Sequence, residues 1–186
     1  VTTVAATDPE VPSLQTLTYS IVGGADAARF TIDASTGALI FAAAPNHEAP
    51  ADAGANNVYD VIVQVADGDG GSDTQAIAVT VTNVNEAPVI TSNGGGSSAS
   101  VNAAENQTGV ATVASSDVDG STAVYSISGG ADAALFAIDS ATGVLTFNAA
   151  PNYEAPTDAG GDNVYDVMVR VIDGNGGSDT QALAVT

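Results

Sequence analysis

A long internal repeat limits what this chain can fold into. The residues from Tyr19 to Thr80 recur from Tyr125 to Thr186 at a constant offset of 106, and 45 of these 62 aligned positions are identical. A period of about 100 residues is typical of independent domains in tandem, because solenoid repeats are only about 20 to 50 residues long. The sequence therefore predicts two copies of one domain.

The joint between the copies is the stretch Thr82-Asn83-Val84-Asn85-Glu86-Ala87-Pro88, where a run of alternating Val and Thr stops. We place the first copy at residues 1–86 and the second at residues 87–186. The first copy has no counterpart of residues 87–109, and the second stops before a counterpart of the joint. We therefore expect the chain to be a segment of a longer array of repeats that begins and ends inside a repeat.

Alternating apolar residues predict strands in both copies. Between Val58 and Val65, every second residue is Tyr or Val, and the stretch from Tyr165 repeats this pattern. Shorter strands are expected over residues 124–128, 136–138 and 144–147. About seven strands in about 100 residues, with no long helical pattern, indicate an all-β fold, namely two tandem immunoglobulin-like Greek-key β-sandwiches.

The charge balance excludes several classes of function. The chain has 22 acidic residues and two basic ones, and its net charge is -20. Nucleic acids and anionic membranes would be repelled by such a surface. The chain has no Cys and one His, so a disulfide framework, a zinc site and a Ser-His-Asp triad have almost nothing to be built from. We therefore expect a protein that is not an enzyme.

Acidic and amide side chains recur where the predicted strands end. Ca²⁺ takes six to eight oxygen ligands, from carboxylates, amides and backbone carbonyls. No single copy places enough of these residues at one end, whereas two abutting copies would. They are Asp8, Glu10, Asn46, Glu48 and Asp67 in the first copy, Asn83, Asn85 and Glu86 in the joint, and Glu105, Asp117, Asp119, Asn152, Glu154 and Asp173 in the second.

The order of these motifs resembles the cadherin repeat in its bacterial form, over essentially the whole chain. Glu105 is similar to the early-strand Glu of that family, and Asp117-Val118-Asp119 to its Asp-x-Asp loop, with Asp8-Pro9-Glu10 as the other copy. Asn152-Tyr153-Glu154 and Asn46-His47-Glu48 resemble its Asp-Arg-Glu motif, with Asn in place of Asp. The joint is similar to the family's Asp-x-Asn-Asp-Asn-x-Pro linker but is one residue shorter.

This resemblance implies calcium sites between successive domains. One interdomain site would take its ligands from Asn46, Glu48, Asn83, Asn85, Glu86, Asp117, Asp119 and Asp173. An upstream half-site would consist of Asp8, Glu10 and Asp67, and a downstream half-site of Glu105, Asn152 and Glu154. Because Asn replaces Asp and the linker is shortened, the resemblance implies fewer or weaker ions than the family pattern.

We therefore expect a calcium-binding structural or adhesion module of a large secreted or cell-surface bacterial protein, in which Ca²⁺ stiffens the hinge. Its expected partners are neighbouring repeats, with homophilic contacts or surface glycans as further candidates, and the fragment itself should be monomeric. The alternative is a carbohydrate-binding or spacer module attached to a secreted polysaccharide-degrading enzyme. The aromatic residues argue against sugar stacking, because all but Tyr153 pair between the copies at core-like positions.

Overall fold

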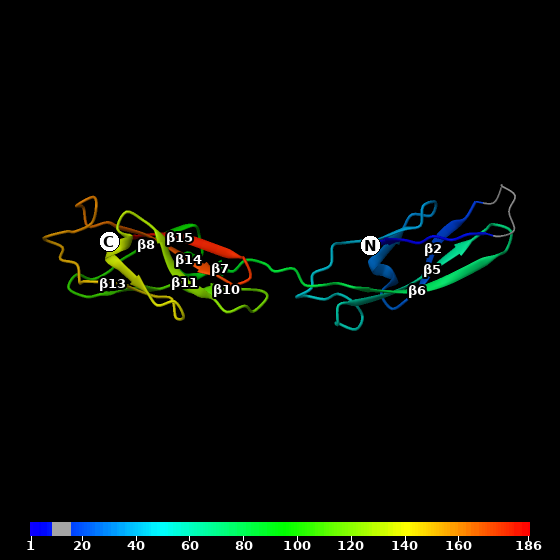
Figure 1. Cartoon of the computed structure of the whole chain (residues 1–186), viewed down its shortest axis with the longest axis horizontal. Coiled ribbons are helices and arrows are strands. Elements are labelled where there is room, and N and C mark those ends of the chain that lie inside the picture. The colour runs from blue at the N-terminus through cyan, green and yellow to red at the C-terminus, as the bar shows by residue number, and fades with distance from the viewer. Residues whose placement is uncertain (9–15) are drawn as a thin grey trace. The chain divides into compact units, whose positions relative to one another are not determined.

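The computed structural model describes residues 1–8 and 16–186, and the chain divides into two compact units. Unit 1 is Val1–Val84 and unit 2 is Asn85–Thr186. Each unit is built almost entirely of strands (Figure 1), so the all-β prediction is confirmed. The described residues form six strands in unit 1 and nine in unit 2, against about seven expected for each copy.

The described part of unit 1 forms two three-stranded sheets. One has the order β1-β4-β3 and the other the order β2-β5-β6, and all pairs are antiparallel. A short 3-10 helix, η1, joins the two sheets. The elements are β1 (Thr2–Thr3), β2 (Thr18–Gly23), η1 (Ala27–Arg29), β3 (Phe30–Ile32), β4 (Ala38–Phe41), β5 (Val58–Ala66) and β6 (Ser72–Thr80).

Unit 2 repeats these sheets and extends them. Its sheets have the orders β12-β13-β9, β11-β14-β15-β8 and β10-β7, and β8 runs parallel to β15. The elements are β7 (Val89–Ile90), η2 (Ser92–Gly94), β8 (Ser98–Val101), β9 (Gly109–Thr112), β10 (Ser115–Ser116), β11 (Val124–Gly129), η3 (Ala133–Leu135), β12 (Phe136–Ile138), β13 (Val144–Phe147), β14 (Tyr165–Ile172) and β15 (Ser178–Val185).

The sequence repeat is also a repeat of strand register. Tyr19 pairs with Val65 in unit 1, and Tyr125 pairs with Val171 in unit 2. The same register shift follows Ile21 in β2 and its counterpart in β11. A one-residue slip would turn each buried side chain outwards, so the shared alternation of apolar residues explains why both copies pair identically.

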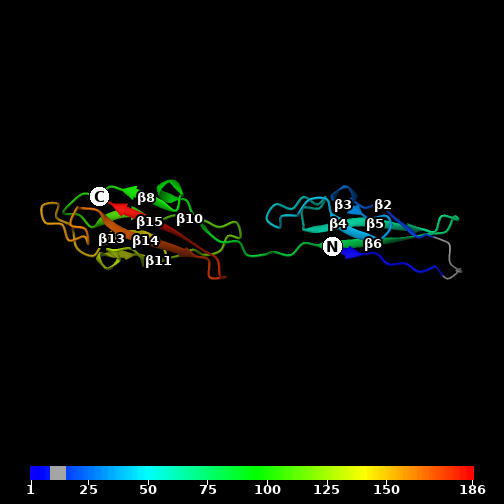
Figure 2. The same cartoon turned by 90° about the horizontal axis from the view of Figure 1, so that it is seen from above.

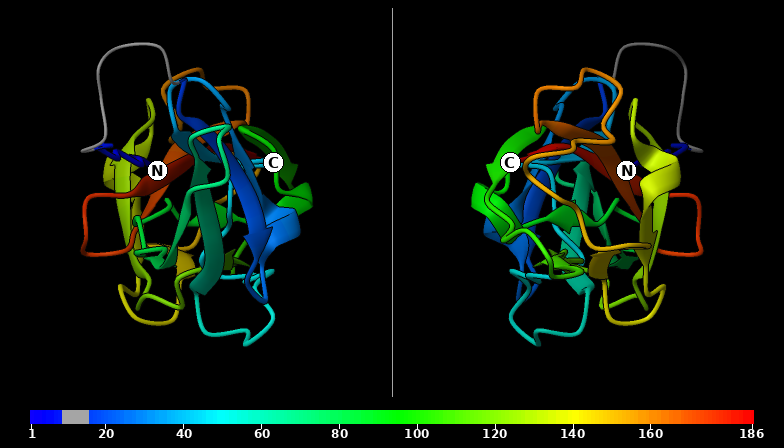
Figure 3. Two further views of the ribbon diagram at one scale, coloured as in Figure 1. Left: turned by 90° about the vertical axis from the view of Figure 1, so that its right-hand side faces the viewer. Right: turned by 90° about the vertical axis from the view of Figure 1, so that its left-hand side faces the viewer.

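Each unit buries one apolar core made of residues from both of its main sheets, whose strands can be followed in Figure 2 and Figure 3. In unit 1, Phe30 stacks on Phe41 with ring centroids 4.7 Å apart, and Tyr59 meets Phe41 edge-on. The unit 2 counterparts of these rings pack in the same way. The unit 2 core also includes Ile90 of β7, and no residue of the described part of unit 1 corresponds to it.

Gly24, next to the register shift, lies where the backbone approaches strand β5 closely. Gly24 has a φ of +104°, and an added Cβ would overlap the Asp60 carbonyl oxygen and lie 2.5 Å from the Val61 Cα. Gly70 has a similar φ of +112°, but its Cβ would meet nothing within 4 Å. Gly24→Ala should therefore cost about 1 to 3 kcal/mol more than Gly70→Ala, since only the first adds a clash to the backbone strain.

Native-state hydrogen exchange of the β5 and β6 amides measures this difference, and the β14 and β15 amides of unit 2 serve as a reference within the same molecule. Equal loss of protection in both variants would mean that the close approach of Gly24 to β5 does not exist in solution.

Candidate metal centre

The candidate ligand Asp173 follows β14 directly and opens the tight hairpin to β15. Its carboxylate is buried, at 6% exposure, although no basic residue lies in the hairpin. Oδ1 accepts hydrogen bonds from the backbone N–H groups of Asn175 and Gly177, at 2.7 and 3.0 Å. The hairpin backbone therefore holds this carboxylate ionised and in one orientation.

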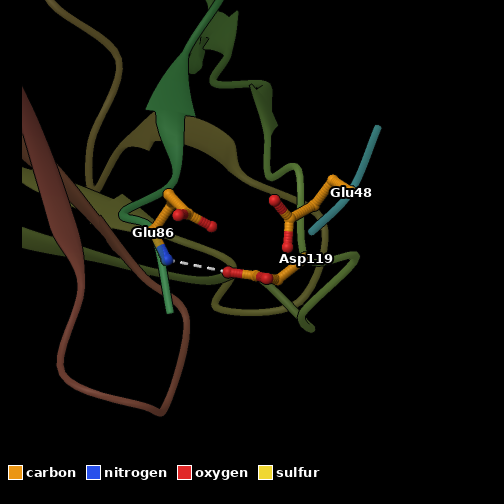
Figure 4. Close-up of side chains that lie close together, drawn as sticks. All are labelled: Glu48, Glu86 and Asp119. Atoms are coloured by element: carbon orange, nitrogen blue, oxygen red, sulfur yellow. Dashed lines mark hydrogen bonds between the residues drawn. The ribbon is translucent and has the colours of Figure 1, made fainter. Parts of the chain in front are cut away.

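The linker residues bind to this carboxylate and to its neighbour. Asn85 Nδ2 donates to Asp173 Oδ2 at 2.7 Å and to the Glu86 carbonyl oxygen at 3.1 Å. The Glu86 N–H donates to Asp119 Oδ2 at 2.8 Å, as the dashed line in Figure 4 shows. Two acidic side chains thus hold the start of unit 2 in place and bring the Glu86 carboxylate to the same pole.

The Asp117-Val118-Asp119 loop adds a carboxylate oxygen without a hydrogen bond. The Asp119 N–H donates to Asp117 Oδ1 at 2.9 Å, whereas Asp117 Oδ2 is buried and has no hydrogen-bond partner in the structure. Leaving a buried acceptor unpaired costs about 1 to 3 kcal/mol, and more for a charged one. Such an atom fits a site completed by a cation.

The spacing of the carboxylates suits a large cation. Glu86 and Asp119 each offer an oxygen, and the two oxygens lie within 4.8 Å of each other. Two ligands of one Ca²⁺ ion, each about 2.3 to 2.6 Å from the metal, can be separated by up to about 5 Å. The distance is therefore compatible with one shared ion.

The hydrogen bonds lower the pKa of Asp173 below its ordinary value. The bond from Asn85 is the largest cause, the backbone N–H groups of Asn175 and Gly177 add to it, and burial works in the opposite direction. This carboxylate is therefore ionised at neutral pH, as a metal ligand must be.

Two of the unit 1 candidates lie in one turn. Asn46 Oδ1 accepts a hydrogen bond from the Glu48 N–H at 2.9 Å, and Glu48 Oε1 lies 3.2 Å from His47 Nδ1. The joint residue Asn83 is exposed near the end of unit 1. The Asn46 side chain is therefore fixed on the Glu48 backbone, and the Glu48 carboxylate lies beside the His47 ring.

Sequence reasoning missed Asn57, which lies against this turn. Its Nδ2 donates to the His47 carbonyl oxygen at 2.9 Å, and its Oδ1 is buried without a hydrogen-bond partner. Asn57 has a φ of +63°, and its counterpart Asn163 shares that φ and makes the same contact with Tyr153. The sequence signal that could have identified Asn57 is that both copies carry an Asn at this position, next to a strand.

The half-sites at the other two poles are partly described. In the upstream half-site, Asp67 Oδ1 accepts three N–H bonds, from Asp69, Gly70 and Gly71, and Asp8 and Asp67 line one cavity of about 150 Å³. Glu10 lies outside the described residues.

The downstream half-site is fully described. Glu105 Oε2 accepts a hydrogen bond from the Tyr153 N–H at 3.2 Å, and Asn152 Oδ1 accepts one from Glu154 at 3.0 Å. The early-strand Glu and the Asn-Tyr-Glu motif therefore lie side by side.

The structure thus brings together Asn85, Glu86, Asp119 and Asp173 through direct hydrogen bonds, with Asp117 beside them. All five lie within unit 2. Their role as ligands, and the participation of the unit 1 residues in the same site, stay predictions.

Comparisons with known proteins define the fold. No protein-family model matches the sequence, and no curated protein does. Among solved structures, human protocadherin-24 EC1-2 is 24% identical with a TM-score of 0.59, over 92% of this chain and 81% of that one. Mouse cadherin-23 EC22-24 is 20% identical with a TM-score of 0.58, over 91% of this chain and 52% of that one.

A third structure, of protocadherin gamma B2 extracellular cadherin domains 3-6, covers all of this chain at 21% identity with a TM-score of 0.57. The chain spans about half of the length of the first of these matches, at 46% and 52%. No helix among the described residues is long and apolar enough to cross a membrane. The fold is therefore the cadherin-like, immunoglobulin-type β-sandwich.

The Asn85 contact predicts a titration effect. Asn85→Ala removes the largest cause of the lowered Asp173 pKa, so the pKa should rise. A carboxyl group with a lowered folded-state pKa stabilises the fold above its unfolded pKa, about 3.9 for Asp, and this contribution is lost as the pH falls through the folded pKa. The variant should therefore gain less stability than the parent as the pH rises from acid to neutral.

Carboxyl NMR titration in metal-free buffer with chelator measures the Asp173 pKa directly. Asn175→Ala is the matched control, because the Asn175 side chain donates to Ser121 Oγ while its backbone N–H still serves Asp173. If both variants shift the Asp173 pKa equally, the Asn85 contact is not the cause.

Proposed function

We propose that this chain is a calcium-binding module of the adhesion type, from a secreted or cell-surface bacterial protein, and that Ca²⁺ binds at the Asp117, Asp119 and Asp173 pole of unit 2. The buried, unpaired Oδ2 of Asp117 carries this proposal, because a bound cation would satisfy it. The carboxylates of Glu86, Asp119 and Asp173 would complete an oxygen-rich site around it.

The donor set favours Ca²⁺ over other metals. The chain has no Cys, and its one His lies outside unit 2, so the sulfur and nitrogen ligands that Zn²⁺ prefers are missing there. Mg²⁺ demands near-ideal octahedral geometry, whereas Ca²⁺ accepts six to eight oxygens in flexible arrangements. A cluster of carboxylates on irregular loops therefore matches the coordination that Ca²⁺ accepts.

Binding would reorient Asn85. Its Nδ2 now donates to Asp173 Oδ2, so its positive end faces the carboxylate that a cation would also contact. A half-turn of the amide would replace the N–H group with Oδ1, the atom that a hard cation binds. We propose this exchange as the local change on binding.

The position of the joint between the two copies leads us to propose a mechanical function for the bound ion. We propose that Asn83 and the unit 1 residues Asn46 and Glu48 add ligands to the same ion, so that it bridges the two units. Without the ion, carboxylates brought together at the joint repel one another. With it, the hinge would stiffen and transmit force along an array of repeats.

We propose the extracellular setting of this chain on two grounds, its resemblance to the cadherin repeat and its fold. Similar structures are extracellular cadherin domains, and one is the cis-dimer of protocadherin gammaB7 EC3-6. We propose that neighbouring repeats are the first partners of this chain, and that contacts with like chains or surface glycans come second.

Asp117→Asn tests the site. Calcium binding to the parent chain should be measurable by calorimetry, with a dissociation constant of about 10⁻⁴ to 10⁻³ M, as for other extracellular modules. Removing one charged ligand should weaken it on the order of tenfold or more, because carboxylate number sets the affinity of such sites.

Asp166→Asn is the control, since Asp166 is an exposed residue of the neighbouring strand β14 and makes the same change of charge. Equal weakening in both variants would mean that Ca²⁺ responds only to overall charge. No binding heat with millimolar Ca²⁺ in the parent would contradict the proposal.

The hinge is tested separately by small-angle X-ray scattering. With Ca²⁺, the scattering of the parent should become that of a single rigid particle, whereas chelated protein should need an ensemble of orientations. Glu48→Gln should retain binding in unit 2 but lose part of this stiffening. Stiffening unchanged in Glu48→Gln would remove Glu48 from the proposed site and leave the unit 2 site intact.

A further inference from the structure

The outward face of the four-stranded sheet of unit 2, β11-β14-β15-β8, carries no net charge. Along β14, the residues that alternate with the buried core residues are Asp166, Met168 and Arg170, and all three are exposed. The residues that point outwards from β8, β11 and β15 are uncharged. One carboxylate and one guanidinium balance each other here, although the whole chain carries a net charge of -20. This face can therefore approach another acidic chain without local repulsion.

Beside Met168 the face is hollow. The neighbours of Met168 across the sheet are Gly129 on β11 and Ala182 on β15, and Ser98 on β8 follows. Each of these three has a short side chain or none, and Met168, Ala182 and Ser98 line a cavity of about 520 Å³. Met168 itself is 38% exposed. Because a Met side chain is flexible and fills irregular gaps, this residue can adapt to a surface that covers the hollow.

The two charged residues lie symmetrically about Met168. Asp166 precedes it by two residues and Arg170 follows it by two, so each is about 7 Å from it along the strand. Neither forms an ion pair in the part of the chain that the structure describes. The face therefore presents an unpaired negative charge and an unpaired positive charge at equal distances from one central apolar side chain.

Such a pattern is complementary to itself. In a two-fold symmetric pair both copies use the same patch, so that residue i contacts residue j and j contacts i. If the axis crosses β14 at Met168, the two β14 strands run antiparallel and each Arg170 faces Asp166 of the other copy. Packed sheets lie about 10 Å apart, a separation that a long Arg side chain and a carboxylate can span between them.

We propose that this outward face, which we call the β14 face, is a docking surface for the β14 face of a second copy of this chain. Two reciprocal ion pairs between Arg170 and Asp166 flank a central contact between the Met168 side chains, which fill the hollows. This inference rests on the adhesive part of the proposed function, because it gives a surface to the contacts between like chains. It uses none of the candidate calcium ligands.

Unit 1 does not offer the same surface. Its strand β5 has Asp60, Ile62 and Gln64 at the positions that correspond to the three β14 residues. A carboxylate is present, but the guanidinium that would face it in a second copy is replaced by a neutral amide. The reciprocal ion pairs are therefore a property of unit 2 alone, although the two copies are otherwise closely similar in sequence.

The size of the β14 face indicates a weak contact. β14 has eight residues, at about 3.4 Å each, and four strands lie about 4.8 Å apart, so the face measures roughly 500 Å². A stable interface buries about 800 Å² per partner. We therefore expect a dissociation constant on the order of 10⁻⁴ to 10⁻³ M. The chain would be monomeric when dilute, whereas linked repeats would gain avidity.

Charge exchange tests the proposed pairing. Asp166→Arg and Arg170→Asp each replace both ion pairs by like charges, so each variant alone should self-associate at least about tenfold more weakly than the parent. An equal mixture of the two variants should associate about as strongly as the parent, because every guanidinium then faces a carboxylate. Sedimentation equilibrium at up to about 1 mM protein measures these dissociation constants, in chelator and at about 0.15 M salt to screen the overall charge.

Asp60→Arg is the matched control, because it makes the same change of charge at the corresponding exposed position of unit 1. It should self-associate like the parent. Monomeric parent at the highest concentration, weakening by Asp60→Arg equal to that by Asp166→Arg, or a mixture that associates no better than its components would overturn the proposal. Since these measurements are made in chelator, such a failure is distinct from a failure of calcium binding, which calorimetry of the parent reports.

Discussion

Buried carboxylates that accept backbone N–H bonds hold this structure together. With only two basic residues in the chain, ion pairs cannot neutralise its carboxylates. Asp26, at 4% exposure, accepts the N–H groups of Ala53 and Asp60, and Asp132 repeats this contact in unit 2. These bonds join segments some 30 residues apart, so each carboxylate fixes a loop against a strand.

Asp117 does not follow this hydrogen-bonding pattern, and the difference supports the proposed calcium site. The carboxylates of Asp26, Asp132 and Asp173 are buried and use both oxygens as acceptors. Asp117 instead has one buried oxygen with no hydrogen-bond partner, beside the pole where Glu86 and Asp119 also lie. Folding therefore brings together negative charge that the protein's own donors only partly satisfy. A divalent cation would resolve this locally, and it would also offset the self-repulsion of the whole chain.

Much of the fold could be predicted because its signals are local. Alternation of apolar residues located the strands over residues 136–138 and 144–147, and the identity of the copies implied that their registers would match. The hairpin role of Asp173 follows from its place between a strand and a glycine-rich turn. The contact of Asn85 with Asp173 joins residues 88 positions apart, and the family motif order was the only sequence signal for it.

Other features could not be predicted because they depend on packing between distant segments. In the sequence Asp26 resembles an ordinary turn residue, and only the fold shows that it is buried and accepts the Ala53 N–H. The burial of Gln181 depends on Ser92, Asn93 and Gly96, which are 85 to 89 positions away in the chain, so no pattern within its own strand could show it.

Calcium binding at the pole formed by Asp117, Asp119 and Asp173 is the proposal on which the function of this chain rests. The most direct measurement is a calcium titration of the isotopically labelled chain, followed by amide chemical shifts. We expect saturable shifts concentrated in the Asp117 to Gly120 loop, the Asp173 to Gly177 hairpin, and Asn85 and Glu86. Small, unsaturated shifts spread over acidic residues throughout the chain would contradict it.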